Sequence, residues 1–288
     1  MKNALAQANS ATGEGGIAAV PYPASETFSL HSRPGATKVI YLDFDGNTTT
    51  GTPWNSNFTG GAAIATPPYS TDADTSSFSA GELDNIQNIW LRVVEDFSPF
   101  EVDVTTEYPG LEALRRSSTS DTSFGVRVCI GGSSYDWFEA GAGGVAYLNS
   151  FSWNTDSPCF VFTAQLGNGN PKYTAEAVSH DGQTNITEYY TGHANWAPFM
   201  GVGYYRDVVQ WSKGDYASAN NKQDDTAIIA GICSYRQDVH GDSIVDATPL
   251  TGTTPLATGV IERRSDADLF GFSTGAGTVS FTARLRRL

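Results

Sequence analysis

The stretch from residue 172 to residue 216 contains the side chains with the clearest capacity for chemistry. Glu176 precedes His180 by four residues, a spacing that places both side chains on one face of a helix. His193 follows in a glycine-flanked loop, from which its imidazole could approach His180. Because imidazole and carboxylate groups are common zinc ligands, His180 and His193 are the candidate metal ligands of this chain.

Each candidate ligand also has an interpretation without a metal. A glutamate and a histidine one helical turn apart commonly form a solvated pair on an exposed face, and a loop histidine commonly bonds to backbone or water. A catalytic zinc requires three protein ligands and one open position for water. No two of the four histidines are spaced by four residues, so the paired ligands of a zinc helix are absent. We therefore expect any zinc site here to be weak.

The sequence around His180 resembles the active-site region of bacterial secreted metallopeptidases of the metzincin type. The resemblance is carried by four runs between residues 175 and 216, namely AEAVSH, HDG, YYTGHANWAPFMGVGYY and QWSKGDY. It implies a zinc endopeptidase with a helix carrying H-E-x-x-H-x-x-G-x-x-H and a methionine turn beneath the metal. Met200 in the run WAPFMG matches that turn.

The zinc-binding helix of that family has no full counterpart in this chain. The first and third histidines of the family motif are about ten positions apart. Removing one such interval joins the start of the motif to its end as Ser-His-Asp-Gly, which is the sequence from Ser179 to Gly182. His180 therefore corresponds to either the first or the third ligand. The general-base glutamate and the middle histidine are missing, so we expect a chain without catalytic activity.

The strand expected at residues 143–151 has a functional implication of its own. In the metzincin fold the strand before the last lies antiparallel at the edge of the sheet and pairs with the substrate backbone. By resemblance, Gly144, Val145, Ala146 and Tyr147 take that place. An open edge is a template for an extended peptide, so peptide binding can outlast the loss of catalysis. The alternative is an ordinary edge strand without a ligand.

Two aspartates close the first expected strand, KVIYLDFDG at residues 38–46. Asp43 and Asp45 alternate with Leu42 and Phe44, so both carboxylates are expected on one face. Carboxylate oxygens suit a hard cation such as calcium. The alternative is that both residues cap the end of the strand.

Composition narrows the classes of partner. The formal net charge is −14 at pH 7, which argues against nucleic-acid binding, since that binding depends on basic patches. No run of about 18 apolar residues occurs, so we expect no membrane span.

The first residues lack the apolar segment of a signal peptide, whereas the resemblance implies a secreted protein. The three cysteines form no CxxC pair and allow either one disulfide with a free thiol or three small buried side chains.

Strand and helix patterns alternate along the chain. Strand patterns lie at 38–46, 100–106, 125–130, 143–151 and 159–164, and helix patterns lie at 79–97, 111–116 and 223–232. This order predicts an α/β (α+β) layer whose strands run in mixed directions. The resemblance implies a metzincin-like mixed five-stranded sheet with helices and a small Met-turn subdomain.

We expect three regions. Residues 1–36 are rich in Ala, Ser, Gly and Pro and are expected as an N-terminal tail or linker. Residues 37–233 form the metzincin-like peptidase domain. Residues 234–288 form a linker and an incomplete β-sandwich, because GVIERRSDADLFGFSTGAGTVSFTA resembles the first half of a bacterial pre-peptidase C-terminal domain. Unpaired strand edges are expected to make that half fray.

Three functional hypotheses follow, and all take a protein or peptide as partner. The chain is an inactive descendant of zinc endopeptidases, or a non-catalytic module that binds peptides along its edge strand. The third hypothesis is that a segment of about ten residues has been lost near His180 from an otherwise active protease.

Overall fold

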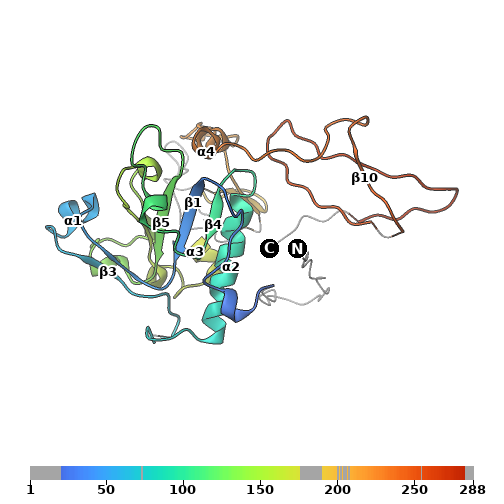
Figure 1. The fold of residues 1–288 in the computed structure, drawn as a ribbon. Coiled ribbons are helices and arrows are strands. Elements are labelled where there is room, and N and C mark those ends of the chain that lie inside the picture. Colours follow the sequence, from blue (N-terminus) through green and yellow to red (C-terminus); the bar gives the residue numbers. More distant parts are fainter. Residues whose placement is uncertain are drawn as a thin grey trace.

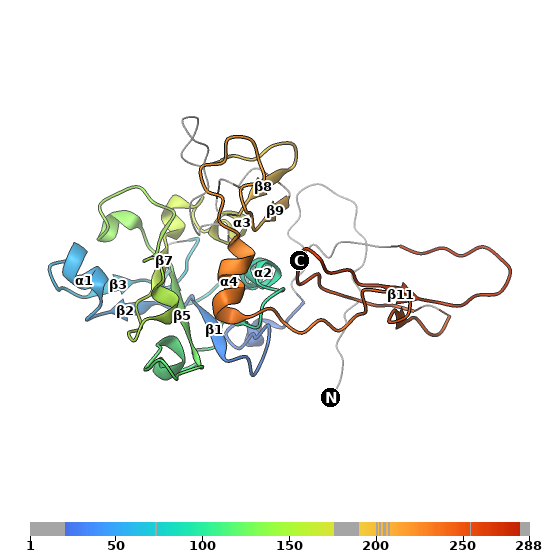
Figure 2. The ribbon, with the colours of Figure 1, turned by 90° about the horizontal axis from the view of Figure 1, so that it is seen from above.

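The computed structural model describes residues 21–72, 74–175, 190–199, 201, 203, 206, 208–253 and 255–282 (Figures 1 and 2). Its strands are β1 (Lys38–Asp43), β2 (Asn47–Thr49), β3 (Ile64–Thr66), β4 (Asp103–Thr105), β5 (Phe124–Ile130), β6 (Gly144–Val145), β7 (Cys159–Val161), β8 (Trp196–Pro198), β9 (Val208–Gln210), β10 (Thr248–Pro249) and β11 (Phe270–Gly271). Its α-helices are α1 (Pro53–Phe58), α2 (Ala80–Asp96), α3 (Pro171–Ala175) and α4 (Asp225–Cys233).

A five-stranded sheet in the order β4-β1-β5-β7-β6 forms the centre of the fold. The first four of these strands are parallel to one another, and β6 pairs with β7 in the antiparallel direction. Helix α2 lies along one side of this sheet (Figure 1). The α/β class and the mixed five-stranded sheet expected from the sequence are therefore confirmed.

Helix α2 begins and packs as its sequence pattern predicts. Ser79 and Glu82 cap its first turn reciprocally, with the Ser79 amide donating to the Glu82 carboxylate at 2.8 Å, which satisfies donors that a helix start leaves free. Ile86 and Ile89 are fully buried against the sheet. The Trp90 indole donates to the Val104 carbonyl at 2.9 Å, which fixes the helix to β4.

The strand β4 is more deeply buried than its alternating sequence suggested. Residues 102–106 are all buried, because α2 covers one face and residues 21–36 cover the strand edge. Ser32 donates its amide to the Val104 carbonyl at 3.0 Å, and Thr106 donates its amide to the Leu30 carbonyl at 3.0 Å. The sheet edge at β4 is therefore occupied by the protein itself.

Residues 21–36 thus differ from the tail expected at 1–36. Leu30 is 3% exposed and belongs to the main core, and the Gln87 amide donates to the Thr27 hydroxyl at 2.9 Å. Thr27 and Leu30 thus attach the segment to the folded core. The Ala-, Ser-, Gly- and Pro-rich composition did not indicate these contacts. Residues 1–20 lie outside the described part of the chain.

The helices expected at 111–116 and 223–232 also appear, the first as a shorter 3₁₀ turn. The 3₁₀ turn covers Leu111–Leu114, and the second is α4. The three cysteines are all free thiols, and Cys129 and Cys233 are buried, which accords with small buried side chains rather than a disulfide. Within the described ranges, no helix is long and apolar enough to cross a membrane.

Beyond α4 the chain leaves the sheet as a long extension, coloured orange to red in Figures 1 and 2. Its strands β10 and β11 pair over two residues each. Large apolar side chains such as Ile244 and Val245 are exposed along it. Among its described residues from 238 to 282, the single buried side chain is Glu262.

Candidate functional site

Strand β6 lies at the edge of the sheet opposite β4. Gly144 pairs with Val161 and Val145 pairs with Phe160. The Phe162 amide donates to the Gly143 carbonyl at 2.8 Å, whereas the Val161 carbonyl accepts from Gly131 at 3.0 Å and so points toward β5. Along an antiparallel pair, residues whose backbone groups bond to the partner strand alternate with residues whose backbone groups point away from it. The amide and carbonyl of Gly144 therefore face away from β7, and no strand among the described residues pairs with that side.

The edge strand is shorter than the sequence predicted. It was expected to include Ala146 and Tyr147, but the ladder ends at Val145. The Tyr147 ring lies 4.0 Å from the Trp54 ring centroid, and Asn149 adopts a left-handed conformation with φ of 64°. This aromatic contact and turn draw the chain away from β7. Strand alternation alone cannot reveal a long-range ring contact of this kind, so the prediction for residues 146–151 was wrong.

Aromatic side chains form the floor beneath β6. This aromatic floor consists of Trp54, Trp137, Phe138, Phe160 and Phe162, and Val145 and Tyr147 pack against it. Two exposed apolar side chains are near in space or in sequence: the ring of Phe58, 43% exposed, has its centroid 5.2 Å from that of Phe138, and Leu148, 89% exposed, follows Tyr147 in the chain. Backbone groups at an edge with apolar side chains beside them are the features that strand-addition sites use.

The candidate zinc ligand His180 and its neighbour Glu176 lie outside the described residues, as does Met200 of the expected Met-turn. His193 is described and exposed, and its Nδ1 lies 2.8 Å from the Tyr190 hydroxyl. Its backbone exchanges two hydrogen bonds with Trp196, at 2.9 and 3.0 Å. The ring bond is thus to a tyrosine hydroxyl, whereas the sequence-based alternative to a metal ligand was a bond to backbone or water, and His193 as a zinc ligand stays a prediction.

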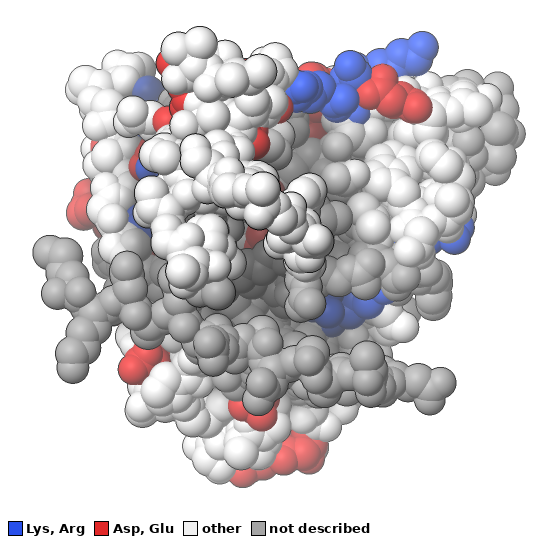
Figure 3. All heavy atoms as spheres, turned by 90° about the vertical axis from the view of Figure 1, so that its right-hand side faces the viewer, with Lys and Arg blue, Asp and Glu red and all other residues white. Residues whose placement is uncertain are grey.

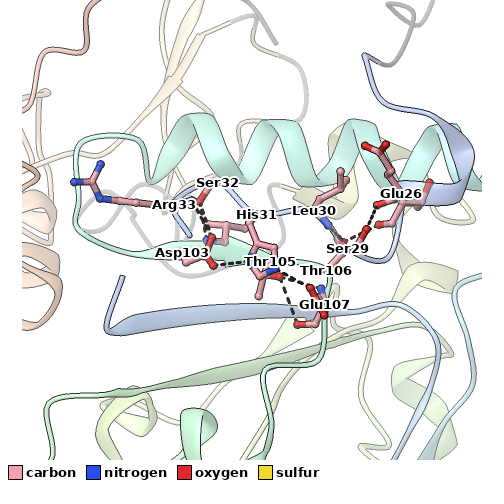
Figure 4. Close-up of polar contacts among 12 residues, drawn as sticks. Glu26, Ser29, Leu30, His31, Ser32, Arg33, Asp103, Thr105, Thr106 and Glu107 are labelled. Carbon is pink, nitrogen blue, oxygen red and sulfur yellow. Dashed lines mark hydrogen bonds and ion pairs between the residues drawn. The ribbon is translucent and has the colours of Figure 1, made fainter. Parts of the chain in front are cut away.

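The other two described histidines have both ring nitrogens engaged. In His31 they face the carboxylates of Asp103 and Glu107, at 2.6 and 2.9 Å (Figure 4). In His240 they face the Thr248 hydroxyl and the Thr258 carbonyl, at 2.8 and 2.9 Å. Neither imidazole has a nitrogen left for a metal.

The described residues do not fit a catalytic zinc. Among them, the one group of three or more potential metal ligands in close proximity is made of carboxylates and contains no histidine. A zinc site of the metalloendopeptidase type requires histidine ligands and an open position. No catalytic step through zinc is therefore assigned to this part of the chain.

The Asp43 carboxylate forms an ion pair with an arginine of the protein. Its carboxylate lies 2.5 Å from Nη1 of Arg127, and Nη2 of the same guanidinium lies 2.9 Å from Asp156. Burial first, and then the adjacent Asp45, raise the pKa of Asp43 to about 7, although Arg127 acts in the opposite direction. The ion pair accords with a structural role for Asp43, and calcium at Asp43 and Asp45 stays a prediction.

Arg127 was missed in the sequence. It stands in the strand Phe124–Ile130, whose other residues are apolar or glycine. A single arginine in such a strand indicates a buried acidic partner, because an unpaired buried charge is strongly unfavourable. That signal indicates an acidic partner but does not by itself select Asp43 and Asp156.

Basic and acidic side chains both lie on the face shown in Figure 3. On the face shown in Figure 3, the described basic side chains are separated from one another or lie beside acidic ones. Nucleic-acid binding sites collect Lys and Arg in a patch or stripe, and the absence of nucleic-acid binding stays a prediction from the net charge of −14.

No protein-family model, curated protein or solved structure matched this chain. Its function is therefore inferred from its own residues and geometry.

Proposed function

We propose that this protein is a non-catalytic descendant of secreted metzincin-type zinc endopeptidases and binds extended peptides along β6. The observation that carries this proposal is the sheet order β4-β1-β5-β7-β6, in which β6 alone runs antiparallel and lies at the edge. That is the position the resemblance implied for the substrate-pairing strand. The runs WAPFMG and QWSKGDY support the same ancestry.

The two edges of the sheet differ in a way that favours β6 as the binding site. Residues 30–32 cover the edge at β4 through backbone hydrogen bonds, whereas the outward groups of Gly144 have no strand partner among the described residues. Among the described residues, β6 is therefore the edge at which a peptide strand could add without displacing a paired segment.

The surroundings of β6 indicate the kind of peptide. The exposed side chains of Phe58 and Leu148 offer apolar contacts to alternate residues of an added strand. The net charge of −14 disfavours acidic peptides through long-range repulsion. The proposed ligand is thus an extended, apolar segment with neutral or basic flanks.

Turnover is not part of the proposed function. The motif lacks the general-base glutamate and the middle histidine, and a general base alone contributes about 10²- to 10⁴-fold to rate. The same proposal makes residues 234–288 a linker and part of a pre-peptidase C-terminal β-sandwich, on the sequence resemblance of that region, and makes the protein secreted, on the resemblance to secreted metallopeptidases.

Binding of a fluorescent peptide library tests this proposal, with Gly144→Pro as the variant and Gly144→Ala as the matched control. Proline removes the outward amide and blocks strand addition, while the bonds to β7 stay. We expect wild type and Gly144→Ala to bind, and Gly144→Pro to bind about tenfold more weakly because it lacks the outward N–H donor and so loses one hydrogen bond.

Thermal melts of all three proteins verify that the folded state is kept. Mass spectrometry of the peptides and zinc analysis of the dialysed protein accompany the titration. Equal affinity of Gly144→Pro and wild type would refute the edge site. Cleavage that a chelator abolishes would refute the non-catalytic assignment.

A further inference from the structure

A buried carboxylate with an unsatisfied oxygen lies where the C-terminal extension begins. Glu262 has a side chain that is 3% exposed, and its Oε1 lies 3.3 Å from Nε of Arg236. Its Oε2 is buried and has no hydrogen-bond partner. Buried polar atoms are nearly always satisfied, so this oxygen lacks a partner that the site is built to hold.

Two further carboxylates lie close to the Glu262 carboxylate. Asp238, Glu262 and Asp266 each offer one oxygen, and the three oxygens all lie within 4.8 Å of one another. The Asp238 carboxylate is oriented by the amide of His240 at 2.8 Å, and the Asp266 carboxylate is oriented by the amide of Glu262 at 2.7 Å. Arg236 offsets only part of the negative charge that these groups concentrate.

We infer that Asp238, Glu262 and Asp266 form a calcium site that joins the segment after α4 to the turn at residues 262–266. This site is separate from β6 and from Asp43 and Asp45, and it does not depend on the proposed peptide binding.

The ligand chemistry selects calcium. All three donors are carboxylate oxygens, which hard cations prefer and which lack the nitrogen or sulfur typical of zinc sites. Calcium binds oxygen at about 2.3–2.6 Å, so two of its ligands can be up to about 4.6–5.2 Å apart. Magnesium requires a tighter octahedron at about 2.0–2.1 Å, which suits widely spaced ligands on two separate segments less well.

The site also explains an unusual feature of the extension. Among the described residues from 238 to 282, Glu262 is the single buried side chain, so apolar burial contributes little to holding this part of the chain together. A bound cation would offset the charge and supply the cross-link that an apolar core otherwise provides.

The test is calorimetric titration of calcium into the full chain after removal of divalent ions. We expect one calcium per chain with a dissociation constant on the order of 10⁻⁴–10⁻³ M, the range of extracellular modules. Asp238→Asn and Glu262→Gln should each weaken binding about tenfold or more. Asp238 is exposed, so its variant tests the site even if the buried Glu262 variant folds poorly.

Asp246→Asn is the matched control, because this carboxylate lies on the same segment but bonds to the Ser243 hydroxyl at 2.7 Å. It should bind calcium as the wild type does. Limited proteolysis gives a second readout, in which calcium slows cleavage between residues 243 and 262 in wild type and control but not in the two site variants.

Three results would overturn the assignment: no calcium-dependent heat, calcium binding that Asp238→Asn and Glu262→Gln leave unchanged, or magnesium binding as tight as that of calcium.

Discussion

The imidazole of His31 lies between two carboxylates, with Nδ1 2.6 Å from Asp103 Oδ2. Its Nε2 lies 2.9 Å from Glu107, and Figure 4 shows the residues around the ring joining the N-terminal segment to β4. Burial alone would lower the pKa of His31, but the hydrogen bonds and charges of Asp103 and Glu107 outweigh it and raise this pKa above its ordinary value of 6.5.

This arrangement predicts that the protein loses stability as pH rises. A histidine whose folded pKa is raised stabilises the fold fully below the unfolded pKa, and this contribution is lost as pH rises through the folded pKa. We therefore expect the contribution to decline above pH 6.5, in urea melts recorded at half-unit intervals. His31→Gln should flatten this decline.

His193→Gln is the control for that experiment, because the His193 ring bonds to the Tyr190 hydroxyl instead of a carboxylate. Its profile should follow the wild type. A His31→Gln profile with the same slope as wild type would show that the histidine does not couple to folding.

The buried Arg127 predicts a large loss of stability on substitution. Arg127→Leu leaves the Asp43 carboxyl, 2% exposed, without its cation, and breaking a buried pair in this way costs about 3–5 kcal/mol. Because the pKa of Asp43 is raised, its carboxyl can take up a proton and lose its charge. We therefore expect a loss of stability at the lower end of this range, about 3 kcal/mol. Denaturant unfolding at pH 7 measures it.

Arg115→Leu is the surface comparison for Arg127→Leu. Arg115 pairs with Glu112 at 2.7 Å on the exposed surface, and pairs of this type contribute about 0–1 kcal/mol. Similar losses in both variants would mean that burial of the Asp43 pair has no special effect.

The contact of β1 with β5 predicts that Gly125 tolerates no side chain. A Cβ at this position would lie 2.1 Å from the Val39 carbonyl oxygen, so Gly125→Ala forces the two strands apart. We expect a loss of about 1–3 kcal/mol in thermal or urea unfolding. Gly81→Ala in α2 meets open space and should instead be neutral or stabilise by up to about 1 kcal/mol. Equal effects of the two substitutions would contradict the close strand contact.

Local patterns predicted the elements that are defined by their own residues. The apolar spacing of α2, with Ser79 and Glu82 at its start, gave its position to within one residue at each end. The alternation in β1 and the run Phe124–Ile130 likewise predicted two central strands. These features depend on interactions within a few residues, which a single sequence displays.

Features that depend on distant partners were not predicted. Residues 21–36 appeared to be a tail, because their contacts with Gln87 and Val104 join parts of the chain about 60 to 72 residues apart. The end of β6 at Val145 depends on the ring of Trp54, far away in sequence. The roles of Arg127 and Glu262 likewise could not be predicted, because each depends on carboxylates that only the fold brings close.

Hydrogen–deuterium exchange with and without a bound peptide tests the central claim most directly, because it reports on individual amides of β6. The Gly144 amide faces outward, whereas Val145 already pairs with Phe160. We predict that peptide binding slows exchange at Gly144 strongly and at Val145 little, with the peptide recovered intact. Unchanged exchange at Gly144 in a saturated complex, or a cleaved peptide, would contradict a non-catalytic binding edge.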